Sequence, residues 1–193
     1  MNHRLLCSLA AIGLTYAGAA SADPPRIKGN YAVVGNLACL ISPGGFTANL
    51  VAINPGFAYS STSDIEGVSY YDGNGHGTSS GTNVTINPPP TPGFNPEVGS
   101  DTFAGTFTYT VNSDGTFTQT STDTHGTILT GTRSGHTFTI DLSQGTGLIG
   151  KDARSLTLAT TAPYMETITY SNGNAFTRIC YRQRALIKMD DGE

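Results

Sequence analysis

The chain has 193 residues, with 10 Lys and Arg against 14 Asp and Glu and a net charge of −4. This mildly acidic balance argues against nucleic acid as a partner, because phosphate binding needs a basic face. The length allows one ordinary domain with a core, and the sequence contains no phosphate-loop or dinucleotide fingerprint, so we expect no cofactor.

The beginning of the chain predicts export. Two basic residues precede an uncharged apolar stretch from Leu5 to Ala20, and a small-residue cleavage site ends at Ala22. This order is typical of a secretory signal peptide in residues 1–22. We therefore expect a secreted or periplasmic protein without a membrane span, a single domain in residues 23–189 and a disordered tail in residues 190–193.

The mature chain would keep two cysteines, because cleavage removes Cys7 and leaves Cys39 and Cys180. An oxidising compartment favours the pairing of two cysteines. We predict a disulfide between Cys39 and Cys180, which would join the start of the domain to its end. The alternative is two buried free thiols.

Apolar and polar residues alternate along several segments. From Thr102 to Val111 the odd positions are Phe, Gly, Phe, Tyr and Val, and the even positions are Thr and Ala. A period of two places successive side chains on opposite faces of a strand, so the aromatic face should be buried and the Thr face exposed. The same alternation recurs in residues 137–142 and 155–158.

Turn sequences rich in Gly, Asn and Asp separate the alternating segments. They lie at residues 72–75, 112–115, 134–135 and 172–174. Gly and Asn tolerate the positive φ that tight hairpin turns require. These spacings predict an antiparallel meander with little helix.

One segment interrupts this pattern, because residues 87–96 are rich in proline and cannot form a central strand. We interpret it as an extended loop. It is either a surface connector between two hairpins, which we favour, or a lid that points Phe94 into a pocket.

Three of these segments together resemble a known group. They are Gly29-Asn30-Tyr31-Ala32-Val33, the stretch from Gly67 to Gly77, and the stretch from Gly105 to Thr116. In their turns and spacing they resemble small exported bacterial proteins with calycin-like barrels, similar to lipocalins and to allene oxide cyclase or dirigent-type barrels. The resemblance implies a closed barrel that can hold a small ligand.

We therefore predict an all-β fold, formed by a single antiparallel, mostly up-and-down β-barrel of about eight or more strands. A closed barrel has no exposed strand edges, whereas an open sheet has two. It also makes the first and last strands neighbours, as the Cys39–Cys180 bridge requires. A β-sandwich is the alternative, since it too can bring its terminal strands together.

The last strand contains three arginines of one parity. Arg178, Arg182 and Arg184 alternate with the same period as Cys180. If Cys180 points into the barrel, the guanidinium groups line its interior and favour a carboxylated ligand. If this face points to water, Ile179 and Tyr181 are inside instead. The cost of burying charge favours the second arrangement.

Asp123 and His125 share one strand face, which suits either a metal site or a base with its orienting residue. A metal site normally needs three or four ligands, so we expect no metal.

We expect a binding module whose interior holds a small, largely apolar molecule that can carry a carboxylate. The candidate ligand-binding residues are Tyr70, Phe103, Phe107, Tyr109, Phe117, Phe138, Arg178 and Arg182. One alternative is a barrel enzyme of the cyclase or isomerase type that uses Glu66, Glu166 and Arg178. Another is a structural protein whose surface contacts a partner. The sequence decides neither whether the protein is an enzyme nor its oligomeric state.

Overall fold

The computed structural model describes residues 25–88, 96–141 and 143–190. The predicted signal peptide, Phe94 and most of the predicted C-terminal tail lie outside the described residues. Within the described ranges, no helix has the length and apolar composition needed to cross a membrane.

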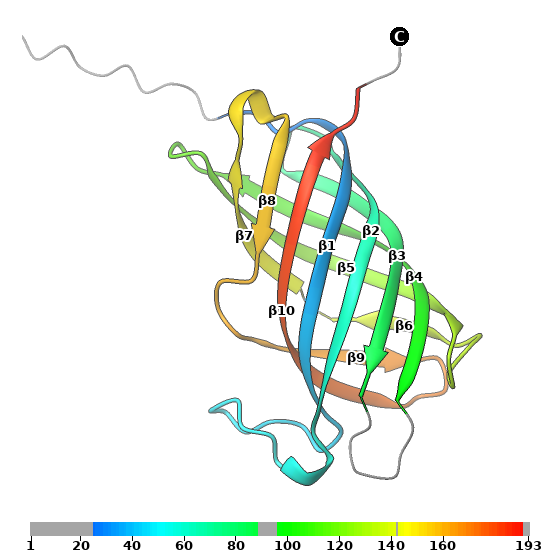
Figure 1. Cartoon of the computed structure of the whole chain (residues 1–193). Coiled ribbons are helices and arrows are strands. Elements are labelled where there is room, and N and C mark those ends of the chain that lie inside the picture. Colours follow the sequence, from blue (N-terminus) through cyan, green and yellow to red (C-terminus); the bar gives the residue numbers. More distant parts are fainter. Residues whose placement is uncertain (1–24, 89–95, 142, 191–193) are drawn as a thin grey trace, which may run out of the picture.

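One antiparallel sheet contains all ten described strands (Figure 1). The strands are β1 (Gly29–Ser42), β2 (Tyr59–Tyr71), β3 (His76–Asn87), β4 (Glu97–Val111), β5 (Thr116–Thr130), β6 (Thr137–Ile140), β7 (Ser143–Ile149), β8 (Ser155–Ala159), β9 (Met165–Tyr170) and β10 (Ala175–Lys188). Two short 3₁₀ turns, η1 (Pro55–Phe57) and η2 (Lys151–Ala153), accompany them. The predicted all-β fold is confirmed, and the single sheet excludes the two-sheet sandwich.

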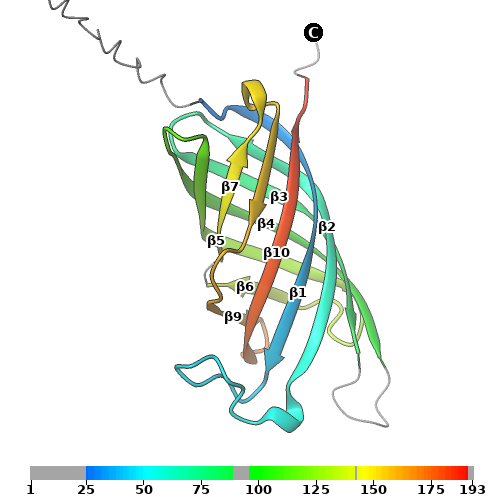
Figure 2. The same cartoon turned by 60° about the vertical axis from the view of Figure 1, so that its left-hand side comes forward.

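Eight strands close a ring, because β1 pairs with β2 on one side and with β10 on the other. Strands β1 to β5 and β10 form most of the ring. Two short strand pairs connect β5 to β10 and so close it: β6 with β9, and β7 with β8. Both views show these short pairs between the long strands β5 and β10 (Figures 1 and 2). This division of the wall makes the ring less regular than the up-and-down barrel expected from the sequence.

The predicted hairpins account for most of the meander. Tight turns join β2 to β3, β4 to β5 and β9 to β10 at the expected Gly and Asn residues. A longer turn at residues 131–136 joins β5 to β6. The sequence did not indicate the two bulges in β5, where Thr122 and Leu129 are the extra residues in the pairing with β4. The bulge at Thr122 reverses the parity of β5, so that Ser121 and Thr124 both face inward.

Glycines permit the close approach of neighbouring strands. Gly67 of β2 lies opposite Gly81 of β3, and a Cβ on either would collide with the backbone of the partner strand. Gly35 of β1 has the same relation to β10, where a Cβ would meet the backbone and the side chain of Arg184. Strongly curved sheets need such positions, because side chains there would separate the strands.

Cys39 and Cys180 occupy opposite positions on β1 and β10, with their Cα atoms 4.1 Å apart and their sulfur atoms joined. Both side chains are buried on the inner face of the ring. The pairing of the terminal strands thus brings the two residues close enough for the predicted disulfide.

An aromatic core fills the upper end of the ring as drawn in Figure 1, where the turns 72–75 and 112–115 and the 3₁₀ turn η2 lie. Tyr71 packs against Tyr31, Phe107 and Tyr109 with ring centroids 5.0 to 5.3 Å apart. The hydroxyl groups of these tyrosines donate to buried acceptors, as amphipathic rings in a core require.

Candidate functional site

Two adjoining cavities lie inside the ring below the aromatic core. The first, which we call the central cavity, has a volume of about 90 Å³ and reaches Phe107 and Leu158 of the aromatic core. The second, the mouth cavity, has a volume of about 120 Å³ and extends toward the opposite end. The two cavities share the lining residues Leu37, Asn83, Phe138, Ile140 and Arg178. A water molecule needs about 10–15 Å³, so each cavity has room for several.

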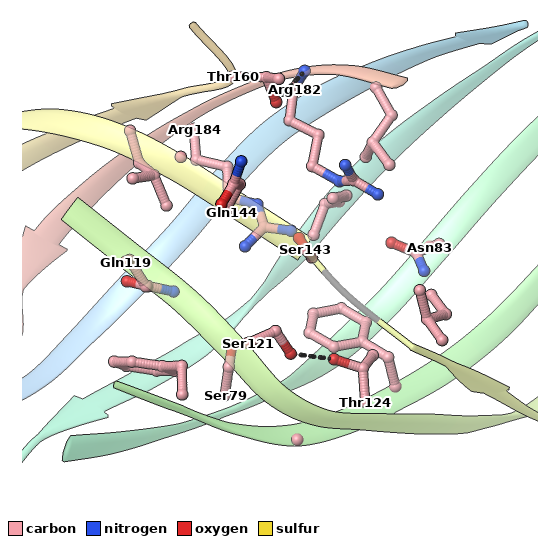
Figure 3. Close-up of a pocket in the computed structure, with 18 of the residues that line it drawn as sticks. Ser79, Asn83, Gln119, Ser121, Thr124, Ser143, Gln144, Thr160, Arg182 and Arg184 are labelled. Carbon is pink, nitrogen blue, oxygen red and sulfur yellow. Dashed lines mark hydrogen bonds between the residues drawn. The ribbon is translucent and has the colours of Figure 1, made fainter. Parts of the chain in front are cut away.

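The lining of the central cavity is mixed, with polar side chains set among apolar surface. Figure 3 labels most of its polar side chains, which come from β3, β5, β7, β10 and the residue that follows β8. They are Ser79, Asn83, Gln119, Ser121, Thr124, Ser143, Gln144, Thr160, Arg182 and Arg184. Apolar contact comes from Leu37, Phe103 and Phe138 among others. This mixed lining fits a ligand that has both an apolar part and polar groups.

The arginines of β10 face inward. Arg182 is 6% exposed, whereas Tyr181 on the other face is 53% exposed. The expectation that the arginine face points to water was therefore wrong. The physical reason is Glu166 of β9, a fully buried carboxylate that forms ion pairs with Arg178 at 3.3 Å and with Arg182. A buried charge is tolerated when it has such a partner.

Arg184 differs from its two neighbours, since no described carboxylate lies within ion-pair distance of it. Its buried Nε has no hydrogen-bond partner among the described residues. Burial, with a further contribution from the positive charge of Arg182, lowers the pKa of Arg184 to about 10. The guanidinium group stays protonated at neutral pH, so it is a positive charge beside the central cavity without a carboxylate partner.

Asp101 and Arg133 line the mouth cavity together with two further charged residues, Glu97 and Arg178. Burial raises the pKa of Asp101, although Asn83 donates a hydrogen bond of 2.7 Å to its carboxylate. Arg133 lies over the ring of Tyr170, 5.0 Å from its centroid, and donates to its hydroxyl group. This cation–π contact holds a positive charge at the lower end of the ring.

Seven of the eight candidate ligand-binding residues face the interior. Phe107, Tyr109 and Phe117 belong to the aromatic core, where they fill the upper end. The other four, Phe103, Phe138, Arg178 and Arg182, line the central cavity, as Phe107 does in part. Tyr70 instead lies on the outer face at 42% exposure, and its neighbour Tyr71 takes the inward position.

The remaining candidates lie apart from the cavities. His125 and Asp123 contact each other at 3.1 Å on the outer face, where both are exposed. Over the described ranges, no three His, Cys, Asp or Glu side chains gather as a metal site would require. Glu66, a candidate for the enzyme alternative, is also exposed, and Thr82 donates a hydrogen bond to it.

The sequence contained a signal for Glu166, the ion-pair partner of Arg178 and Arg182. The turn at residues 172–174 fixes the register of the β9–β10 hairpin, which places Glu166 directly opposite Arg178. Opposite charges at a cross-strand position attract, and a count from the turn would have indicated this pair. Asn83 and Gln119 gave no comparable signal, because nothing local distinguishes them from the many other polar residues of the strands.

A comparison of the chain with models of known protein families finds no match. A comparison with curated proteins finds no relative either.

Proposed function

We propose that this protein binds a small organic molecule inside its ring of strands. The observation that carries the proposal is the pair of adjoining cavities below the aromatic core, which the side chains of the ring leave unfilled. Ring interiors of about eight strands can either be filled by side chains or hold one small ligand. Here the upper end is filled and the middle is hollow.

Two features of the lining support a ligand with an acidic group. Leu37, Phe138 and Ile140 lie between the cavities and offer apolar contact to its body. The arginines of β10 offer positive charge that Glu166 balances only in part. Together with the predicted signal peptide, this arrangement fits a secreted or periplasmic binding protein of the calycin-like kind that the sequence resembles.

Native mass spectrometry of the protein purified from the compartment to which it is exported tests this proposal. We expect a bound small molecule whose release follows mild denaturation. Phe138→Ala should weaken the retention of this molecule, because Phe138 lines both cavities. The matched control is Phe57→Ala, which alters a ring that is 65% exposed. A protein that carries no ligand and binds no member of a small-molecule library would refute the proposal.

A second candidate, an enzyme of the cyclase or isomerase type, has one supporting observation. Asp101 lines the mouth cavity, and burial raises the pKa of its carboxyl group as a general acid or base would need. Conversion of a bound molecule by the wild-type protein, abolished in Asp101→Asn with binding retained, would favour the enzyme over the binding module.

A further inference from the structure

Three buried polar atoms of side chains that line the central cavity have no hydrogen-bond partner among the described residues: Nε of Arg178, Nε of Arg184 and Oδ1 of Asn83. Nε of Arg178 lies 3.3 Å from the carboxylate of Glu166 in an ion pair, which leaves the donor Nε of Arg184 and the acceptor Oδ1 of Asn83 for a ligand. Both side chains line this cavity, as Figure 3 shows. A buried donor or acceptor without a partner is costly, so a ligand that supplies one gains from it.

The orientation of the Asn83 carboxamide follows from its other contact. Its Nδ2 lies 2.7 Å from a carboxylate oxygen of Asp101. An ionised carboxylate only accepts hydrogen bonds, so the amide nitrogen must face Asp101 and the oxygen must face away from it. Asn83 therefore offers an acceptor, and a matching ligand group must be a donor such as a hydroxyl.

The other side of the central cavity offers the opposite chemistry. Arg178 and Arg182 share the carboxylate of Glu166, whereas Arg184 has none within ion-pair distance in the described part of the chain. Gln119, which also lines the cavity, accepts a hydrogen bond of 2.7 Å from Tyr71 through its oxygen, so its amide group remains a donor. A guanidinium group and an amide donor together favour an anionic acceptor.

We propose that the ligand is a small hydroxylated carboxylate, whose carboxylate group pairs with Arg184 and whose hydroxyl group donates a hydrogen bond to Oδ1 of Asn83. This inference rests on the proposed function and narrows its ligand class. The volume of about 90 Å³ fits a small acid, since an apolar cavity of about 150 Å³ holds benzene. The ligand is thus more polar than the sequence suggested.

The test is isothermal titration of the purified mature protein with four matched probes. Butyrate supplies the carboxylate alone, 3-hydroxybutyrate and 4-hydroxybutyrate add a hydroxyl at two positions, and 4-hydroxybutyramide removes the charge. We expect at least one hydroxybutyrate to bind about tenfold more tightly than butyrate, and 4-hydroxybutyrate to bind about tenfold more tightly than its amide.

Two variants assign these differences to their residues. Arg184→Met should abolish the preference for the carboxylate over the amide, and Asn83→Leu should abolish the preference for hydroxybutyrate over butyrate. Arg154→Met is the matched control, because its side chain is 72% exposed at the surface, and it should change neither preference. If Asn83→Leu fails to fold, the comparison of butyrate with the hydroxybutyrates on the wild type still tests the acceptor.

Two outcomes would overturn the inference in different ways. If native mass spectrometry finds a neutral or purely apolar ligand that Phe138→Ala releases, the proposed function stands and the hydroxy-acid assignment is wrong. If no probe binds and no ligand is found in the exported protein, water alone fills the cavity and both proposals fail.

Discussion

Arg184→Met should make the protein more stable, because the native side chain holds a positive charge in a partly buried place without a carboxylate within ion-pair distance among the described residues. The lowered pKa means that the folded state disfavours the charged form relative to the unfolded state. The cost is fully present below about pH 10, where Arg184 is protonated in both states, and it disappears only as the pH rises toward 12.5. At neutral pH the wild type therefore bears the whole cost.

The magnitude follows from the size of the shift. The lowering of the Arg184 pKa from its ordinary value to about 10 corresponds to about 3 kcal/mol. Met keeps most of the apolar length of Arg and removes the charge, so the free energy of unfolding should rise by about 1–3 kcal/mol after allowance for relaxation of the site. Each kcal/mol should raise the Tm of a domain of this size by about 2–4 °C.

Urea denaturation at pH 7, followed by circular dichroism, measures this change. Arg154→Met is the control, since its ion pair with Asp190 is exposed and should contribute less than about 1 kcal/mol. If Arg184→Met lowered the free energy of unfolding by 1 kcal/mol or more, Arg184 would be a stabilising residue, and the argument that it is kept for a ligand would be wrong.

Three further variants test the rest of the interior. Cys39→Ser should lower the free energy of unfolding by about 2–5 kcal/mol in thermal denaturation. Alkylation of the denatured, unreduced exported protein should modify neither Cys39 nor Cys180. Two modified thiols would exclude the disulfide. Glu166→Gln should cost about 3–5 kcal/mol in urea denaturation, because two buried guanidinium groups lose their carboxylate; a loss below 1 kcal/mol would contradict this. Burial raises the pKa of Asp101, so its ionised form costs stability above that pKa and none well below the unfolded value. Asp101→Asn should accordingly stabilise the protein at pH 7 and lose its advantage below about pH 4, and an advantage that did not depend on pH would show that charge is not the cause.

The fold could be predicted from local patterns, because alternation and turn residues act between neighbours in the chain. The odd positions from Phe103 to Val111 all face inward as expected, and the hairpin turns lie where Gly and Asn predicted them. The division of the wall into two short pairs could not be predicted. One half of β5 pairs with β6 and the other with β7, and β10 divides in the same way between β9 and β8. No local sequence signal determines these pairings.

The site was harder to predict because it depends on parity and on distant partners. Tyr70 and Tyr71 are chemically identical, and only the register of β2 in the ring decides which one is buried. The arginine face posed the same question, and the general cost of burying charge gave the wrong answer there. That cost is offset by one residue, Glu166, which lies on the preceding strand.

The divided wall also explains why Arg184 is the arginine available to a ligand. The segment of residues 160–164 spans the space between the two short pairs, and Arg182 holds it by donating to the hydroxyl of Tyr164 at 2.9 Å while pairing with Glu166. Arg178 is tied to the same carboxylate. Both residues therefore maintain the wall and are engaged before any ligand arrives. Arg184 lies opposite Gly35, where a Cβ would collide with the Arg184 side chain. It forms no ion pair with a carboxylate among the described residues, and its Nε has no hydrogen-bond partner there. Its charge is therefore the one available to bind an anion.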